Sequence, residues 1–168
     1  MCIRDRYVDV GGGSTEINLI SEGELKSSRS YNIGTVRMLS GMVKNEEKEQ
    51  MHTDLEVLAK EYAPIHIIGS GGNINKLFRL ADKKDKKQLF LPLASLQDIY
   101  RTLKDLPKEQ RIKLFKLKPD RADVIVPAAE IFMEVATRVQ ANGIIVPTIG
   151  LSDGIIDSLY TKNRQWMQ

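Results

Sequence analysis

The sequence predicts an α/β domain with a mixed β-sheet and helices packed on its faces. Short apolar runs of strand length alternate with longer segments in which apolar residues recur at helical spacing. Three of the apolar runs end at glycines, at residues 11–13, at residues 69–72 and at Gly150. The order is three strands, helices, a strand, helices, a strand and a final helix. That order favours a sheet with both antiparallel and parallel neighbours.

The first half of the chain is expected to open with three consecutive strands. The third is polar throughout, as an exposed strand would be. Thr35 is expected to cap a short helix, and Pro64 to stop the long helix that follows. The expected strands cover residues 7–10, 16–21, 24–32 and 65–68, and the expected longer helices cover residues 45–62 and 73–78.

The second half is expected to be mostly helical. Ser95 is expected to cap one helix, and Pro127 to kink the longest helix or divide it in two. Gly143 is expected to end that helix as a C′ glycine. The expected helices cover residues 96–103, 108–115, 121–140 and 151–160, with a charged loop at 82–88, an extended piece at 90–93 and a strand at 144–147.

The glycine run after the first strand is the most informative stretch. Gly11, Gly12 and Gly13 carry no Cβ, so their backbone N–H groups can gather around an anion, and phosphate is the best candidate. Ser14 and Thr15 add hydroxyl donors to this set. A plain hairpin turn is the alternative.

Two carboxylates flank this loop. Asp9 and Glu16 cannot bind phosphate directly, but they fit a divalent cation or an attacking water beside the anion. A second strand–glycine–helix junction, with Gly71 and Gly72 at the helix start, offers a further phosphate contact. Since ligands of such sheets sit at the carboxyl ends of strands, the glycine loops are expected to converge on one cleft. The chain has no Walker A loop and no Rossmann fingerprint.

Composition excludes several classes of protein. The net charge of +3 gives no argument for nucleic-acid binding, and no apolar run is long enough for a membrane helix. A single cysteine, Cys2, rules out an internal disulfide and favours the cytoplasm. Charged residues at positions 4–6 are unsuited to a buried strand, so residues 1–6 are expected to be a non-native leader.

Five stretches in order resemble the exopolyphosphatase / guanosine pentaphosphate phosphohydrolase family, which belongs to the superfamily of actin, the sugar kinases and Hsp70. The resemblance covers residues 7 to about 160 and implies the second of two ribonuclease H-like lobes, with residues 7–162 as that lobe and 163–168 as a tail. The stretches are DVGGGSTE at 9–16, IGTVR at 33–37, IGSGG at 68–72, DRADVIVP at 120–127 and GLSDGII at 150–156.

The resemblance implies hydrolysis of the terminal phosphoanhydride of inorganic polyphosphate, or of the 5′-phosphate of guanosine pentaphosphate, with Mg²⁺. Asp9 would hold the metal and Glu16 would orient the metal or the water. The phosphoryl group would contact Gly11, Gly12, Gly13 and Ser14, with Gly71 and Gly72 across the cleft.

The catalytic base of the family lies in the first lobe, so residues 1–168 alone are expected to be inactive. The resemblance also implies a homodimer. Two other functions stay open from the sequence, an ATP-binding lobe of a kinase or Hsp70 relative and a non-catalytic phosphate-binding module.

Overall fold

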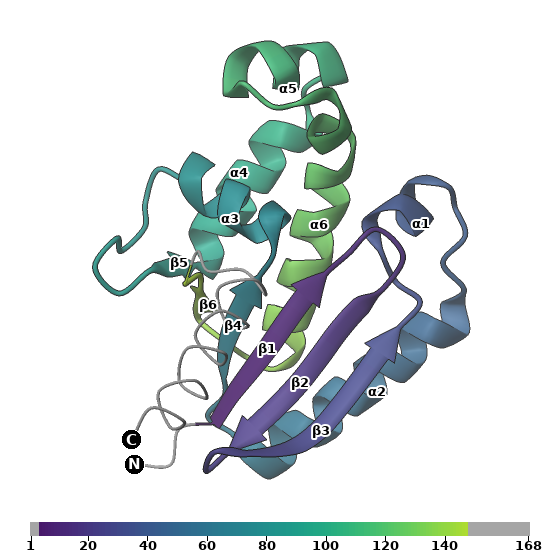
Figure 1. The fold of residues 1–168 in the computed structure, drawn as a ribbon, viewed down its shortest axis with the longest axis vertical. Helices are drawn as coiled ribbons and strands as arrows, with labels where there is room; N and C mark the ends of the chain where they lie inside the picture. The colour runs from purple at the N-terminus through teal and green to yellow at the C-terminus, as the bar shows by residue number, and fades with distance from the viewer. Residues whose placement is uncertain (1–3, 148–168) are drawn as a thin grey trace, which may run out of the picture.

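The computed structural model describes residues 4–147, with side chains from residue 6 onward. Its centre is a six-stranded sheet in the order β3-β2-β1-β4-β6-β5 (Figure 1). The strands are β1 (Arg4–Val10), β2 (Thr15–Ser21), β3 (Glu24–Tyr31), β4 (His66–Ser70), β5 (Phe90–Pro92) and β6 (Gly143–Ile145). The helices are α1 (Thr35–Leu39), α2 (Asn45–Tyr62), α3 (Gly72–Leu80), α4 (Leu93–Lys104), α5 (Lys108–Phe115) and α6 (Pro119–Arg138).

The sheet is mixed, as predicted. β1, β2 and β3 form an antiparallel meander, and β4 pairs with β1 in parallel. β6 continues the parallel part beside β4, and β5 closes the other edge as an antiparallel partner of β6. Because β1 and β4 run in the same direction, their carboxyl ends meet at one edge of the sheet, and the site lies there.

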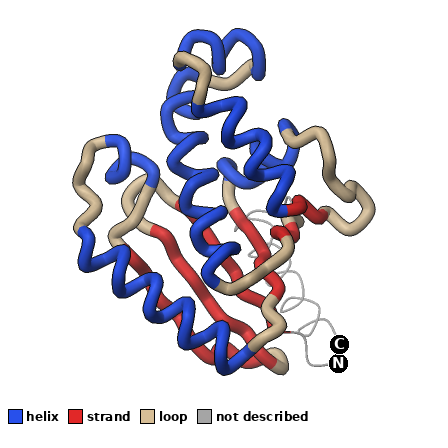
Figure 2. The backbone as a smooth tube through the Cα atoms, turned by 180° about the vertical axis from the view of Figure 1, so that it is seen from behind, coloured by secondary structure: helices blue, strands red, loops and turns tan. Residues whose placement is uncertain are grey.

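The helices α2 and α6 pack on one face of the sheet, and Figure 2 shows the molecule from this side. The alternation of buried and exposed side chains along β1 identifies the two faces. Val8 and Val10 are buried toward the helices, whereas Tyr7 and Asp9 point to the other face and are exposed. Over β1, β2 and β3, that second face carries no helix among the described residues (Figure 1). We refer to it as the open face.

The core is built around α6. Ten of its residues are buried, among them Ile125, Phe132 and Val135. The prediction at Pro127 was a kink or a division of the helix in two. The helix runs unbroken through Pro127, so the division is wrong. In the described part of the chain, no helix is long and apolar enough to cross a membrane.

Three predicted helix caps are wrong. α4 begins at Leu93, directly after Pro92, so Ser95 lies inside the first turn and is buried instead of capping it. Similarly, Gly34 takes the cap position of α1, and Thr35 is its first residue. Gly143 belongs to β6, while Gln140 takes the left-handed conformation (φ 55°) after α6. A Cβ at Gly143 would lie 2.4 Å from the carbonyl oxygen of Leu91, which explains the glycine there.

The strand β1 begins at Arg4, so residues 4–6 lie in the sheet. Arg6 points to the helix-covered side and is fully buried. Its register neighbours are Leu19 on β2 and Ile67 on β4, which are also buried. Within the described residues its guanidinium nitrogens have no hydrogen-bond partner. Burial lowers the pKa of Arg6 to about 10, because the charged form is poorly solvated there.

Candidate functional site

A row of polar residues crosses four strands on the open face, at the carboxyl end of β1. The register pairs Asp9 with Glu16 on one side and with Ser70 on the other, and Glu16 with Ser30. The hydroxyl groups of Ser14 and Ser30 both donate to Glu16 Oε1, at 2.5 Å and 3.2 Å. The two carboxylates singled out from the sequence are therefore neighbours on adjacent strands.

The charge on Asp9 is unfavourable in this position. Partial desolvation of its carboxylate raises the pKa of Asp9 above its usual value, the nearby Glu16 carboxylate raises it further, and a hydrogen bond from Ser70 opposes both. A cation bound beside the glycine loop would relieve the repulsion between these two carboxylates.

The glycine loop forms the turn between β1 and β2 and rests on the start of α1. The Gly11 N–H donates to the Ser14 carbonyl at 2.9 Å and closes the hairpin. Gly34 lies so close that a Cβ there would be 2.3 Å from the Gly12 carbonyl oxygen. Gly12 and Gly13 are exposed, and a Cβ on Gly13 would meet no atom within 4 Å, so the outer side of the loop is open.

The structure does not bring every predicted hydroxyl to this loop. Thr15 is fully buried on the helix-covered side, and its hydroxyl donates to the Ile33 carbonyl at 2.5 Å. It therefore ties β2 to the segment before α1 and does not face an anion on the loop. Ser14 remains beside Glu16 at the end of the hairpin.

The second glycine loop converges on the same place. Gly71 precedes α3 with a φ of 97°, and a Cβ there would lie 2.8 Å from Asp9 Oδ1. Gly72 is the first residue of α3. Asp9 thus lies between the β1–β2 loop and the β4–α3 loop, as the parallel pairing of β1 with β4 requires. The third predicted junction, Gly150, lies outside the described residues.

We expect the substitution Gly71→Ala to cost about 1–2 kcal/mol of unfolding free energy, because an L-residue is strained at this φ. It should also move the Asp9 carboxylate, which the new methyl group would meet. Urea unfolding measures the first effect, and NMR titration of the Asp9 carboxyl carbon measures the second. Gly23→Ala is the matched control, since Gly23 has a φ of 79° and open space around it. An unchanged Asp9 titration in Gly71→Ala would contradict the proposed contact.

Sequence reasoning missed Arg121 as a site residue. The guanidinium lies against the start of α3, where a Cβ on Gly72 would be 2.8 Å from Arg121 Nη2. Arg121 Nη1 donates to Asn73 Oδ1 at 2.5 Å, and Asn73 Nδ2 donates to the Val10 carbonyl at 3.5 Å. Asn73 thereby joins Arg121 to the end of β1. The only sequence signal was its place in the motif at residues 120–127, which indicated a helix start.

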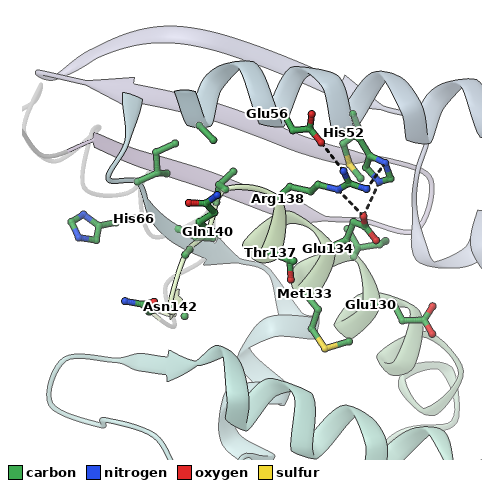
Figure 3. A pocket seen from close by; sticks show the side chains of 18 of the residues that line it. His52, Glu56, His66, Glu130, Met133, Glu134, Thr137, Arg138, Gln140 and Asn142 are labelled. Carbon is green, nitrogen blue, oxygen red and sulfur yellow. Dashed lines mark hydrogen bonds and ion pairs between the residues drawn. The ribbon is translucent and has the colours of Figure 1, made fainter. Parts of the chain in front are cut away.

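A large hollow in the described structure lies elsewhere. It is an open groove of about 1830 Å³ on the helix-covered side, lined partly by α2 and α6. Figure 3 shows Arg138 held there between Glu56 (2.7 Å) and His52 (3.1 Å), while His52 also contacts Glu134 at 2.8 Å. These charges satisfy one another. None of Asp9, Glu16 and the two glycine loops lines this groove, so it is not the predicted site.

Comparison with known proteins identifies the family of the chain. The model of the Ppx/GppA phosphatase family matches residues 3–163. The chain belongs to this family. Exopolyphosphatase 2 of Mycobacterium tuberculosis is 29% identical over 175 residues, which cover 90% of this chain and 54% of that protein. The chain therefore spans about half the length of the curated relatives it matches.

Solved structures of Ppx/GppA proteins have the same fold. The Aquifex aeolicus family member superposes with a TM-score of 0.72 at 27% identity, over 95% of this chain and 57% of that one. An exopolyphosphatase from Cytophaga hutchinsonii gives a TM-score of 0.75 at 21% identity, over 94% and 57%. The predicted fold class, a mixed sheet with flanking helices as in the actin-like ATPases, is confirmed.

Proposed function

We propose that the protein hydrolyses terminal phosphoanhydride bonds, releasing orthophosphate from inorganic polyphosphate or the 5′-phosphate from guanosine pentaphosphate. The observation that carries the proposal is the convergence of two glycine loops on Asp9 and Glu16 at one edge of the sheet. Membership of the Ppx/GppA phosphatase family and the likeness to an exopolyphosphatase support it. A single cysteine supports a cytoplasmic location.

The backbone of the β1–β2 loop would bind the phosphoryl group. The exposed loop with Gly12, Gly13 and Ser14 offers N–H groups to an oxyanion, and Gly71 and Gly72 lie on the far side of Asp9. Gly11 is less available, because its N–H is used inside the hairpin. We assign Arg121 to the phosphate contacts as well, since a guanidinium at the start of α3 matches the charge of the substrate.

The residues at the site fit Mg²⁺. Carboxylate oxygens are hard ligands, and Mg²⁺ commonly takes one or two of them while keeping waters and substrate phosphates. Asp9 would hold the ion, and the raised pKa of Asp9 reflects in part the unrelieved repulsion from Glu16 that such an ion would cancel. When bound, Mg²⁺ would neutralise charge that develops on the phosphoryl oxygens. Glu16 is then free to orient the attacking water, and Ser14 and Ser30 hold its carboxylate in place.

We propose that catalysis also needs a lobe that residues 1–168 do not supply. The family resemblance assigns the catalytic base to that lobe, and the matched relatives are about twice as long. The open face and the exposed glycine loop would form one wall of the cleft between the two lobes. A homodimer of the complete protein is the assembly that the family resemblance implies.

The test is a substrate panel with the protein in its complete two-lobed form. Orthophosphate release is measured with polyphosphate, guanosine pentaphosphate and ATP, each with Mg²⁺ and with a chelator. We expect Mg²⁺-dependent release from one or both of the first two substrates, and no turnover by residues 1–168 alone. Release from ATP without release from polyphosphate or guanosine pentaphosphate would favour an ATP-using relative instead, and binding without release would indicate a regulatory module.

A further inference from the structure

The start of α1 holds three consecutive carbonyl groups of the glycine loop. The Thr35 N–H donates to the Gly11 carbonyl at 3.0 Å. The N–H groups of Val36 and Arg37 donate to the Gly12 carbonyl, at 2.9 Å and 3.3 Å. The third carbonyl, that of Gly13, accepts from the Arg37 side chain through Nε at 2.8 Å.

These contacts fix the direction of the N–H groups that follow. In a planar trans peptide the C=O of one residue and the N–H of the next point in opposite directions. Since the carbonyls of Gly11, Gly12 and Gly13 point to α1, the N–H groups of Gly12, Gly13 and Ser14 point away from it. In the described part of the chain these N–H groups donate to no backbone carbonyl. The loop therefore presents three consecutive donors on its exposed side.

The third of these peptide groups depends on a side chain. Backbone N–H groups hold the Gly11 and Gly12 carbonyls, whereas Arg37 Nε holds the Gly13 carbonyl. Glycine has the freest backbone of any residue type, and no atom would lie within 4 Å of a Cβ at Gly13. The Arg37 contact is thus the hydrogen bond that holds the carbonyl of the peptide carrying the Ser14 N–H.

A surface ion pair would be an alternative role for the Arg37 side chain. Within the described residues, no carboxylate lies within ion-pair distance of Arg37. Its Nε contact also runs to a backbone carbonyl that sits directly before the predicted phosphate contact at Ser14.

We propose that Arg37 is a positioning residue that orients the Gly13–Ser14 peptide, so that the Ser14 N–H donates to the bound phosphoryl group. This rests on the proposed function, because it takes the glycine loop as the phosphate site. Arg37 acts through the loop backbone and not through contact with the ligand. Because this N–H group is already oriented, the loop loses less conformational entropy when the anion binds, and binding is tighter.

The experiment uses the ¹⁵N-labelled chain titrated with tripolyphosphate and Mg²⁺. In the wild type, the amide resonances of Gly12, Gly13 and Ser14 are expected to shift on titration. In Arg37→Ala the free-state Ser14 amide should already be displaced, and the Kd should rise roughly fivefold to tenfold, as loss of one positioned hydrogen bond to a charged group implies. Arg37→Lys keeps the charge but lacks the planar Nε donor, so it should behave like Arg37→Ala.

Arg101→Ala is the matched control. Arg101 is exposed on α4 and pairs with Asp98 at 3.5 Å, so its loss removes the same charge far from the loop and should leave the Kd unchanged. Full binding by Arg37→Lys, or weaker binding by Arg37→Ala with an unchanged free-state Ser14 amide, would overturn the positioning role in favour of a long-range charge effect. Wild-type-like binding by Arg37→Ala would overturn it outright. Absence of any loop shift in the wild type would instead contradict the phosphate site itself.

Discussion

Replacing Asp9 by asparagine in the complete protein is expected to reduce orthophosphate release by on the order of a hundredfold or more, because the site loses the carboxylate proposed to hold the metal. The same substitution is expected to raise the thermal unfolding midpoint slightly. Asp9 is charged next to Glu16, and asparagine removes that repulsion without changing the shape of the side chain. Phosphate release and differential scanning calorimetry measure the two effects on one preparation.

The pH dependence of stability provides the internal check. The pKa of Asp9 is raised in the folded state, so the folded chain binds this proton more tightly than the unfolded chain. Stability is therefore highest below the unfolded pKa and falls as the pH rises through the folded pKa. Wild type and Asp9→Asn should unfold at similar temperatures near about pH 3 and diverge as the pH approaches about 6.

Glu16→Gln is the companion variant, since it removes the other half of the same repulsive pair. The gains in stability of the two single variants should not add in the double variant, because each removes the same interaction. Additive gains would show that the carboxylates do not interact. A midpoint that falls in Asp9→Asn would contradict the electrostatic account of the site.

Replacing Arg6 by methionine is expected to stabilise the fold by about 1–4 kcal/mol. This is the range seen when buried ion pairs give way to apolar residues of similar volume, and Arg6 is a buried charge without such a partner among the described residues. Arg6 is fully buried between Leu19 and Ile67, and its guanidinium has no hydrogen-bond partner among the described residues. Methionine keeps the unbranched stem and removes the charge. Urea unfolding at pH 7 measures the change.

The gain from Arg6→Met should shrink above about pH 10. The pKa of Arg6 is lowered in the folded state to about 10, so the penalty is present below that pH and is relieved as the folded protein loses the proton. Arg29→Met is the control, because Arg29 is exposed on β3, with its nearest acid, Asp54, 3.9 Å away. Destabilisation by Arg6→Met would show that the guanidinium is well accommodated. The leader at residues 1–6 stays a prediction.

Local sequence signals were sufficient to predict helices whose ends are marked by residues within or next to the helix itself. The helix at residues 45–62 and the helix at 108–115 match α2 and α5, because apolar spacing and prolines mark them. The position of the site also followed from local pattern, since glycines directly after strands place Asp9 at a carboxyl edge. The side-by-side arrangement of Asp9 and Glu16 is the register of that hairpin.

Contacts between distant segments were beyond the sequence. In the sequence, Thr15 follows the glycine loop and was predicted to add a hydroxyl donor there. In the structure, strand alternation points its side chain into the core, where the hydroxyl donates to the Ile33 carbonyl. Gly143 looks like a helix end, but the approach of Leu91 explains it. Arg121 lies 48 residues from its partner Asn73, and Arg37 lies 24 residues from its partner Gly13. Local sequence patterns do not indicate contacts over such separations.

The polar row across the open face has a consequence for how this protein can change over time. Its members come one from each of four hydrogen-bonded strands, so the backbone ladder, with strands about 4.8 Å apart, sets their spacing. Substitutions among the aliphatic residues under α6 alter how firmly the sheet is held but not that repeat. Replacements in the interior can therefore change the stability of the protein while the main chain keeps the spacing of the polar row.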